Sequence, residues 1–270
     1  MHPAEFRASG VITLTTDFGL KDPFVGVMKG QVLRRFAAAR IVDLTHEILA
    51  HWPAEAGFWL ARSFRYFPAG TVHLAVVDPG VGSAREIAVV ETEGHVFLAP
   101  DNGLLASVVE QATAPVVQRR LAPAVLDALE LRKVSATFHG RDIFAPVVAE
   151  IAAGRLPPDA LGDRVTDLIP GWIEEPALAA GQVSGVVVTV DHFGNLITNI
   201  DAALLAGLAH PVVRAGGREL PLRRTYSDVR PGDYLALVNS FGVVEVARAE
   251  QSAAAGLGLD RGAPVVVLQR

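Results

Sequence analysis

An acid and a guanidinium stand close together after one apolar stretch, VHLAVVDPGVGSARE, which runs from Val72 to Glu86. The valines and leucine at its start predict a buried strand that ends at Asp78. A loop of small residues then leads to Arg85. Open α/β sheets bind ligands at the carboxyl ends of their strands, so both groups can face one crevice. A structural ion pair that closes a turn is the other interpretation, and this stretch alone does not decide between them.

Further polar side chains stand at or after the ends of predicted strands. Asp17 follows the segment VITLTT, and Asp43 closes the next predicted strand. His46 and His139 lie on loops that follow predicted strands. Each residue has an ordinary explanation as a turn cap or a satisfied loop histidine. Because parallel strands bring their carboxyl ends to one edge, their coincidence favours a site there.

The composition limits the class of protein. The chain has 270 residues, of which 50% are hydrophobic, so a sizeable core is available. A net charge of −5 and a pI near 5.9 argue against a nucleic-acid surface, which normally carries a basic excess. Cysteine is absent, which excludes disulfides and thiolate chemistry. The sequence shows neither the apolar core of a signal peptide nor a membrane-spanning run, so a soluble cytoplasmic protein is expected.

The N-terminal part alternates predicted strands and helices. That pattern is typical of a parallel sheet with crossover helices. It predicts an α/β domain with a mainly parallel sheet over residues 1–168. The predicted strands are residues 11–16, 41–44, 72–77, 86–91 and 95–99, and the predicted helices are residues 23–36, 53–66, a short one ending near 110, and one within 136–150.

The texture changes over residues 169–181, where proline, glycine and acidic residues predict a linker. Short strands separated by glycine turns follow, and they predict a C-terminal all-β domain over residues 182–270, either a small barrel or a sandwich. Its predicted strands are residues 182–190, 195–200, 211–215, 234–238, 243–247 and 264–268.

Several common chemistries find little support in the sequence. The Asp and His residues fit no zinc or dinuclear spacing, since HExxH, HxH and DxD are absent, so no metal site is expected. The Gly80-Val81-Gly82 segment lacks the third glycine and the helix start of a dinucleotide fingerprint. No GxSxG elbow supports a serine triad.

Two polar segments interrupt the apolar runs of the C-terminal domain, DHFGN at residues 191–195 and NSFG at residues 239–242. Each can be a turn beside a core ring. Each can also belong to a purine site, in which an Asn amide contacts the base edge and an aromatic face stacks on the ring, here Phe193 or Tyr226.

Five co-linear segments resemble the S-adenosylmethionine hydroxide adenosyltransferases, relatives of the 5′-fluoro- and 5′-chloro-adenosine synthases. They are TTDFG, DPGVGSAR, TFHGRD, DHFGN and NSFG, and they span nearly the whole chain. The resemblance implies an N-terminal α/β domain and a C-terminal β-barrel. It also implies a homotrimer, with the ligand between one subunit's N-terminal domain and a neighbour's C-terminal domain. The implied reaction turns S-adenosylmethionine and water into adenosine and L-methionine without a cofactor or metal.

The resemblance also implies roles in the N-terminal domain. Asp17 matches the aspartate that accepts both ribose hydroxyls, and Trp52 matches an aromatic residue at the ribose and sulfonium. Asp22 matches a carboxylate near the methionine amino group. Asp78, Arg85 and His139 match the catalytic set that activates water.

In the C-terminal domain, the resemblance assigns Asn195 to the adenine edge and Asp191 to the methionine amino group. Phe193 and Tyr226 match the aromatic walls, and Ser240 matches a contact to the methionine carboxylate. Phe241 stands where the fluorinating relatives have an arginine, which leaves the Ser240 contact open.

The chemistry suits a hydroxide-like nucleophile. Methionine leaves the sulfonium as a neutral thioether, so an anionic nucleophile cancels charge, and a dry pocket favours that cancellation. Arg85 and a protonated His139 would favour hydroxide-like character, while Asp78 would hold or accept the proton. Which of the three takes the proton is left open.

Two departures from the halogenating relatives predict that water attacks. Those relatives offer a serine to the halide where this chain has Gly140, and they carry an inserted loop that has no counterpart here. The alternatives are a halogenase that forms 5′-halo-adenosine and a non-catalytic adenosine-binding module.

Overall fold

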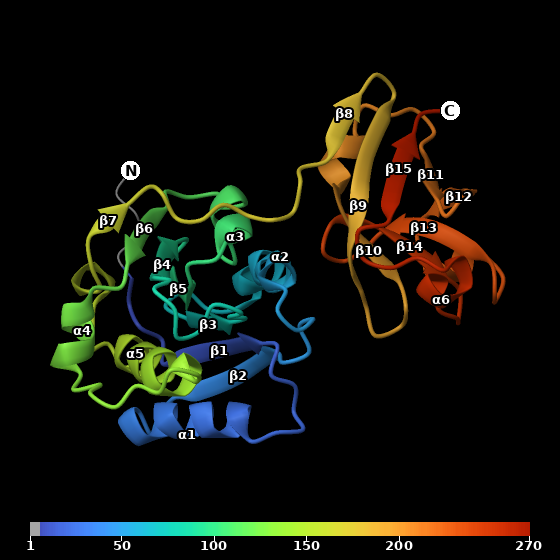
Figure 1. Cartoon of the computed structure of the whole chain (residues 1–270). Helices are drawn as coiled ribbons and strands as arrows, with labels where there is room; N and C mark the ends of the chain where they lie inside the picture. The colour runs from blue at the N-terminus through green and yellow to red at the C-terminus, as the bar shows by residue number, and fades with distance from the viewer. Residues whose placement is uncertain (1–5) are drawn as a thin grey trace. The chain divides into compact units, whose positions relative to one another are not determined.

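The computed structural model describes residues 6–270, and the chain divides into two compact units (Figure 1). The first unit ends at Trp172 and the second runs from Ile173 to Arg270. Each unit has its own sheet and its own core. Over the described residues, no helix combines the length and the apolar character needed to cross a membrane.

A seven-stranded sheet forms the middle layer of the first unit, in the order β2-β1-β3-β5-β4-β6-β7. The strands β2, β1, β3 and β5 run parallel, whereas β4, β6 and β7 pair antiparallel. The predicted α/β class with a mainly parallel sheet is confirmed. The strands are β1 (Val11–Thr16), β2 (Arg40–Thr45), β3 (Val72–Val76), β4 (Ile87–Thr92), β5 (His95–Pro100), β6 (Val117–Arg120) and β7 (Arg164–Val165).

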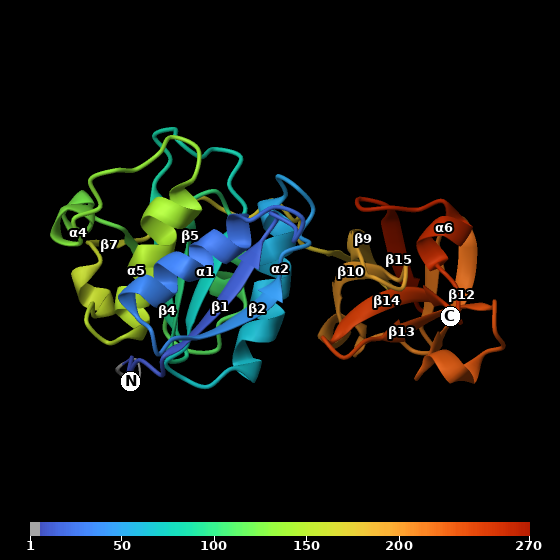
Figure 2. The same cartoon turned by 90° about the horizontal axis from the view of Figure 1, so that it is seen from below.

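Helices cover both faces of this sheet, as strand-to-strand crossovers require (Figures 1 and 2). Met28 of α1 and Phe144 before α5 pack with Leu14 and Leu74 on one face. Leu60 of α2 packs with residues of α3, β3 and β5 on the other face. The helical segments are α1 (Phe24–Arg35), α2 (Pro53–Ser63), η1 (Phe64–Tyr66), α3 (Ala106–Glu110), α4 (Pro123–Ala128), η2 (Gly140–Phe144), α5 (Ala145–Ala152) and η3 (Pro158–Ala160).

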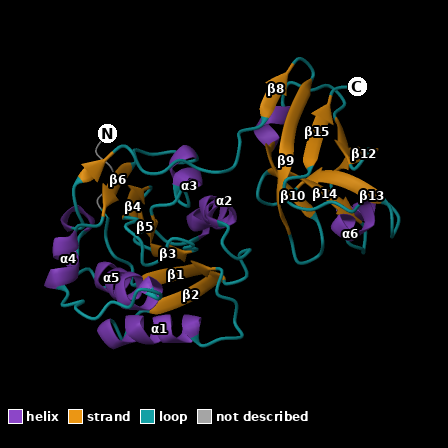
Figure 3. Cartoon of the chain, in the orientation of Figure 1, coloured by secondary structure: helices purple, strands orange, loops and turns teal. Residues whose placement is uncertain are grey.

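A closed barrel of seven strands forms the second unit (Figure 3). The ring runs β10-β14-β13-β12-β11-β15-β9 and closes where β9 pairs with β10. Closure removes the exposed edges that an open sheet would present, and the predicted all-β barrel is confirmed. Its elements are β9 (Gln182–Val190), β10 (Leu196–Asp201), η4 (Ala202–Leu205), β11 (Val212–Ala215), β12 (Arg218–Arg223), η5 (Tyr226–Asp228), β13 (Tyr234–Val238), β14 (Val243–Arg248), α6 (Ala253–Leu257) and β15 (Pro264–Leu268).

Some local predictions differ from the structure. The predicted linker contains a short strand, β8 (Ala177–Ala179), which pairs with β9 outside the ring. The strand β12 was not predicted, because half of the residues in its sequence RELPLR are charged and it contains a proline, features that weaken a strand pattern. Asp43 lies inside β2 and not at its end, since the strand continues to Thr45.

Candidate active site

Two predicted acids emerge at one edge of the parallel sheet. Thr16 of β1 pairs in register with Val76 of β3, so the two strands end side by side. Asp17 directly follows β1, and Asp78 follows β3 by two residues. The topology therefore places both carboxylates at the carboxyl edge, where open α/β sheets bind ligands.

The three residues of the predicted catalytic set form one hydrogen-bonded network. Arg85 Nε lies 3.0 Å from each carboxylate oxygen of Asp78, and Arg85 Nη2 also donates to Oδ2. The same Nη2 lies 2.9 Å from His139 Nδ1. The Asp78 side chain is 5% exposed and the Arg85 side chain 10% exposed. A nearly buried guanidinium thus joins an acid to an imidazole that lies 54 residues away from Arg85 in the sequence.

A close approach between two loops brings His139 to Arg85. Gly82 adopts φ +78°, and a Cβ built on it would lie 2.1 Å from the carbonyl oxygen of Ala136. Only glycine permits that conformation and that contact without strain. The loop that carries Arg85 therefore packs directly on the loop that leads to His139.

Asp142 stabilises the loop that leads to His139. Its carboxylate accepts Arg141 Nε at 2.6 Å and the backbone N–H of Ser135 at 2.9 Å. The Arg141 hydrogen bond holds the pKa of Asp142 down at about 2. His139 precedes a π-helical turn, η2, that runs into α5. Such turns are frequent at functional sites because they redirect a side chain within a helix.

The geometry decides the protonation of His139. A guanidinium N–H can only donate, so Nδ1 must accept and carries no proton. Burial lowers the pKa of His139, and the neighbouring Arg85 charge lowers it further, against the opposing charges of Asp78 and Asp142. The ring is therefore neutral, with its proton on Nε2. A doubly protonated ring would place two donors face to face, so this arrangement disfavours the protonated form of His139 that the sequence analysis allowed.

The other N-terminal site residues lie on the neighbouring loops. Asp17 Oδ2 accepts the backbone N–H of His51 at 2.9 Å, which ties the loop after β1 to the loop that carries Trp52. His51 has φ +65°, so this contact stabilises an uncommon backbone conformation. Asp22 is exposed just before α1 and has no partner among the described residues.

Asp43 and His46 belong to a separate chain of hydrogen bonds and ion pairs. Lys29 Nζ lies 2.6 Å from Asp43 Oδ2, and His46 Nε2 lies 3.0 Å from Asp43 Oδ1. His46 Nδ1 contacts Thr16 Oγ1 at 2.8 Å. These contacts hold β1, β2 and α1 together, so the structural interpretation of these two residues holds.

On the barrel, the turn between β9 and β10 is organised around Asp191. Its carboxylate accepts the backbone N–H groups of Phe193 and Asn195 and the side-chain amide of Asn195. Asn195 is nearly buried, whereas the Phe193 ring is 75% exposed. Ser240 is exposed in the β13–β14 turn and has no partner among the described residues.

A second polar set on the barrel centres on Glu245, which sequence reasoning missed. Tyr226 Oη donates to Glu245 Oε1 at 2.7 Å, and Asn239 Nδ2 donates to Oε2 at 3.2 Å. Burial and the charge of Asp191 raise the pKa of Glu245. A lone acid in the apolar run of β14, VVEVAR, is the only signal that the sequence contained.

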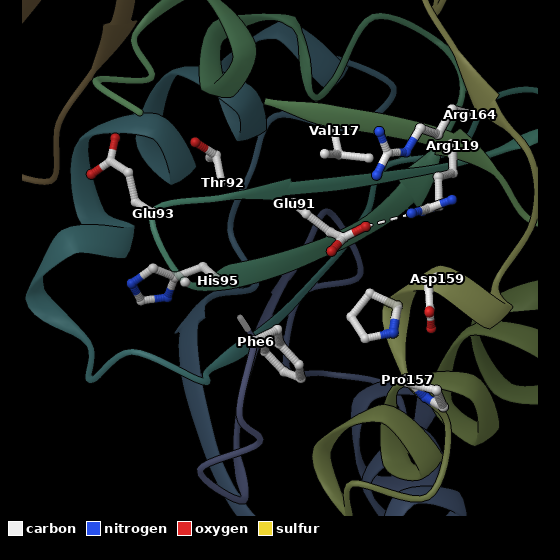
Figure 4. Close-up of a pocket in the computed structure, with 12 residues that line it drawn as sticks. Phe6, Glu91, Thr92, Glu93, His95, Val117, Arg119, Pro157, Asp159 and Arg164 are labelled. Atoms are coloured by element: carbon white, nitrogen blue, oxygen red, sulfur yellow. Dashed lines mark hydrogen bonds and ion pairs between the residues drawn. The ribbon is translucent and has the colours of Figure 1, made fainter. Parts of the chain in front are cut away.

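A cavity of about 270 Å³ lies elsewhere on the first unit, around the β4–β5 turn (Figure 4). The register of β3, β4 and β5 puts this turn at the edge opposite Asp78. The residues that line the cavity include Glu91, His95 and Arg119, and none of the predicted site residues. Among residues 6–270, no cluster of three or more His, Asp or Glu side chains is arranged to hold a metal ion.

The fold and the site together define a two-unit protein, an α/β sheet with a polar network at its strand ends followed by a β-barrel. Comparison with known sequences is specific. The SAM hydroxide adenosyltransferase N-terminal domain matches residues 12–162, and the C-terminal domain of the same family matches residues 185–266. The chain belongs to the SAM hydroxide adenosyltransferase family, where SAM is S-adenosylmethionine.

Similar proteins cover almost the whole chain. An (R)-S-adenosyl-L-methionine hydrolase of Thermus thermophilus is 39% identical over 94% of this chain and 97% of its own length. A fluorinase of Actinoplanes sp. is more distant, at 29% identity over 95% of this chain and 97% of its own. A crystal structure of an uncharacterized conserved protein from Thermotoga maritima superposes with a TM-score of 0.85 and 35% identity, over 96% of this chain and all of that one.

Proposed function

We propose that this protein hydrolyses S-adenosylmethionine to adenosine and L-methionine. The single observation that carries the proposal is the Asp78–Arg85–His139 network at the carboxyl edge of the sheet, whose acid and guanidinium are nearly buried. Family membership and the hydrolase relatives agree with it. The substrate is S-adenosylmethionine itself, and the proposed reaction uses no cofactor or metal.

The reaction is a displacement at the 5′ carbon of the ribose. The oxygen of water forms a bond to C5′ while the C5′–sulfur bond breaks. The electron pair of the breaking bond stays on sulfur, which leaves as the neutral thioether of methionine. As the C–O bond forms, the water protons become strongly acidic, so even a weak base can take one. Asp78 is our proposed acceptor, because the neutral His139 has no free Nδ1 lone pair.

The remaining residues position the reactants. Arg85 holds the acid and the ring together, and the Nε2–H of His139 is free to orient the water oxygen. We assign the ribose hydroxyls to Asp17 and the ribose–sulfonium region to Trp52. We assign contacts with the methionine part of the substrate to Asp22, Asp191 and Ser240. We assign contacts with the adenine base to Asn195, Phe193 and Tyr226.

Gly140 supports water over halide as the nucleophile. A Cβ on Gly140 would lie 3.1 Å from Met28 Sδ and 3.3 Å from the Phe138 ring. A serine there would need its neighbours to move, so the hydroxyl that serves the halide in the halogenating relatives has no ready place. The more distant identity to the fluorinase agrees with this assignment.

We further propose a homotrimer in which the substrate binds between the α/β unit of one subunit and the barrel of a neighbour. The support is the family resemblance, together with the distribution of the proposed contacts over both units. A light-scattering mass of three chains is the expected result, and a monomer that is fully active would contradict the assembly.

The activity is tested with the purified full chain, S-adenosylmethionine and a chelator, with adenosine followed by chromatography. Adenosine and methionine should appear in equal amounts, and a His139→Ala variant that keeps its thermal midpoint should release far less. No adenosine above that variant contradicts the proposal, loss of activity in chelator contradicts metal independence, and halide-dependent 5′-halo-adenosine favours the halogenase.

A further inference from the structure

The β9–β10 turn holds one side-chain amide in a single orientation. Asp191 Oδ1 accepts the backbone N–H groups of Phe193 and Asn195 at 2.9 and 2.8 Å, and Asp191 Oδ2 lies 2.9 Å from Asn195 Nδ2. An ionised carboxylate only accepts hydrogen bonds, so the amino end of the Asn195 amide must face it. The amide oxygen of Asn195 therefore faces away from Asp191.

The backbone makes this orientation rigid. Asp191 N donates to Asn195 O at 3.0 Å, and Gly194 N donates to Asp191 O at 3.0 Å. Asn195 is 6% exposed and leads directly into β10, which pairs with both β9 and β14. The side chain thus has little freedom to turn over while Asp191 remains opposite it.

An amide fixed in this way distinguishes two kinds of purine edge. It presents an acceptor oxygen beside one remaining N–H, which match the amino donor and the N7 acceptor of a 6-aminopurine. A 6-oxopurine offers acceptors at both positions, so its oxygen would face the amide oxygen without a proton between them.

We propose that Asp191 is a positioning residue that sets base selectivity, because it orients the Asn195 amide to bind 6-aminopurines and to reject 6-oxopurines. This inference rests on the proposed function, in which Asn195 contacts the base. It assigns Asp191 a role in recognition of the base, in addition to its proposed contact with methionine. From the usual strength of a bidentate base contact, we expect a preference of about tenfold to a hundredfold.

The substitution Asp191→Asn tests the orientation directly. An asparagine at 191 keeps one oxygen for the two backbone N–H groups, so the turn is preserved. Its amino group then stands where Oδ2 stood and faces the Asn195 amide. The Asn195 amide can accept a hydrogen bond from that amino group only if it flips so that its oxygen faces residue 191. The flip directs the amino group of Asn195 toward the base. The preference should therefore move toward the 6-oxopurine.

Calorimetry on the full chain with adenosine and inosine measures this preference without turnover. The unsubstituted protein should bind adenosine at least tenfold more tightly, and Asp191→Asn should equalise or reverse the ratio. The exchanged pair Asp191→Asn with Asn195→Asp again presents an acceptor to the 6-amino group. It should restore the preference for adenosine over inosine in direction, with weaker binding, because a carboxylate has no N–H for N7. This second variant also covers the case in which the single one folds poorly.

A matched control is Asn195→Ala, which should weaken adenosine binding and remove the discrimination without reversing it. An unchanged adenosine-to-inosine ratio in a folded Asp191→Asn variant, when the unsubstituted protein hydrolyses S-adenosylmethionine, overturns this inference alone. A protein that releases no adenosine from S-adenosylmethionine overturns the proposed function instead.

Discussion

At the scale of single residues, Arg85 determines the state of both groups that it touches. Its guanidinium donates to Asp78 through two nitrogens and to His139 through one of them. These directed contacts use the planar fork of arginine, which a lysine ammonium lacks. The proposed catalytic set therefore depends on the shape of the guanidinium as well as on its charge.

Replacing Arg85 with lysine should lower kcat by roughly a hundredfold or more, because the acid and the ring lose their common partner. The measurement is adenosine release at saturating substrate. Arg214→Lys is the matched control, since Arg214 forms an exposed ion pair with Glu219 on the barrel. An Arg85→Lys protein that keeps its full kcat would remove Arg85 from the mechanism.

The pH dependence of the reaction should report His139. Burial and the Arg85 charge lower its pKa below the ordinary 6.5, so the ring stays neutral above that pH. Protonation converts Nδ1 to a donor that faces another donor, and activity should fall only as the pH drops through this lowered pKa. The profile of kcat/KM gives the midpoint, and a midpoint above 6.5 contradicts the assignment.

At the scale of elements, the site depends on how closely two loops pack. The loop after β3 and the loop before η2 meet at Gly82 and Ala136, far apart in the sequence but adjacent in the fold. The same sheet also carries a buried row of polar groups across three strands. Thr13 of β1 contacts His73 of β3 at 2.7 Å, and His73 contacts His95 of β5 at 3.1 Å.

Gly82→Ala should separate these loops and lower kcat at least tenfold, with a loss of stability of roughly 1–3 kcal/mol for the strained backbone alone. Gly217→Ala is the matched control. Gly217 also has a positive φ, +73°, but a Cβ there meets nothing within 4 Å. Kinetics and urea unfolding of both variants separate backbone strain from loop contact, and equal kcat values would exclude the contact as a requirement.

The histidine row predicts a loss of stability in acid. Burial lowers the pKa of His73 well below 6.5, and burial also lowers the pKa of His95. The unfolded chain binds these protons near 6.5 and the folded chain does not, so this contribution to stability is complete above pH 6.5 and declines as the pH falls. Urea unfolding at pH 7 and pH 5 should show the difference.

His95→Gln should reduce that difference, because one buried titrating ring is removed. His192→Gln is the control, since His192 is exposed on the β9–β10 turn. If the two variants lose the same stability between pH 7 and pH 5, the row of buried histidines does not account for the acid sensitivity.

At the scale of the whole molecule, the proposed contacts are divided between two compact units. The residues that we propose to activate water belong to the α/β unit, whereas the proposed base contacts belong to the barrel. If neighbouring subunits share each site, as we propose, then a defect in one unit and a defect in the other can complement each other when the chains are mixed.

Co-expression of a His139→Ala chain with an Asn195→Ala chain should therefore restore part of the activity. Mixed trimers would contain some sites built from two unaltered units. The measurement is adenosine release by doubly tagged assemblies, with each singly altered protein as its own control. Activity no higher than that of the two parents would contradict a shared site.

The sequence by itself determined the two-part organisation, and it proposed most residues of the candidate site. Strand–helix alternation and then glycine-separated strands predicted the α/β sheet and the barrel, because hydrophobic periodicity and turn residues act locally. The strand-end positions of Asp17 and Asp78 followed from the same patterns. Motif order supplied the remaining residues through the family resemblance.

Only the tertiary structure decided the chemistry that depends on contacts between distant segments. The neutral His139, the Gly82 contact and the hydrogen bond from Tyr226 to the buried Glu245 each require two segments that are remote in sequence to meet. The orientation of the Asn195 amide likewise follows from the atoms of Asp191 that face it. The sequence shows which chemical groups are present, whereas the protonation and orientation of each side chain depend on the neighbours that folding brings to it.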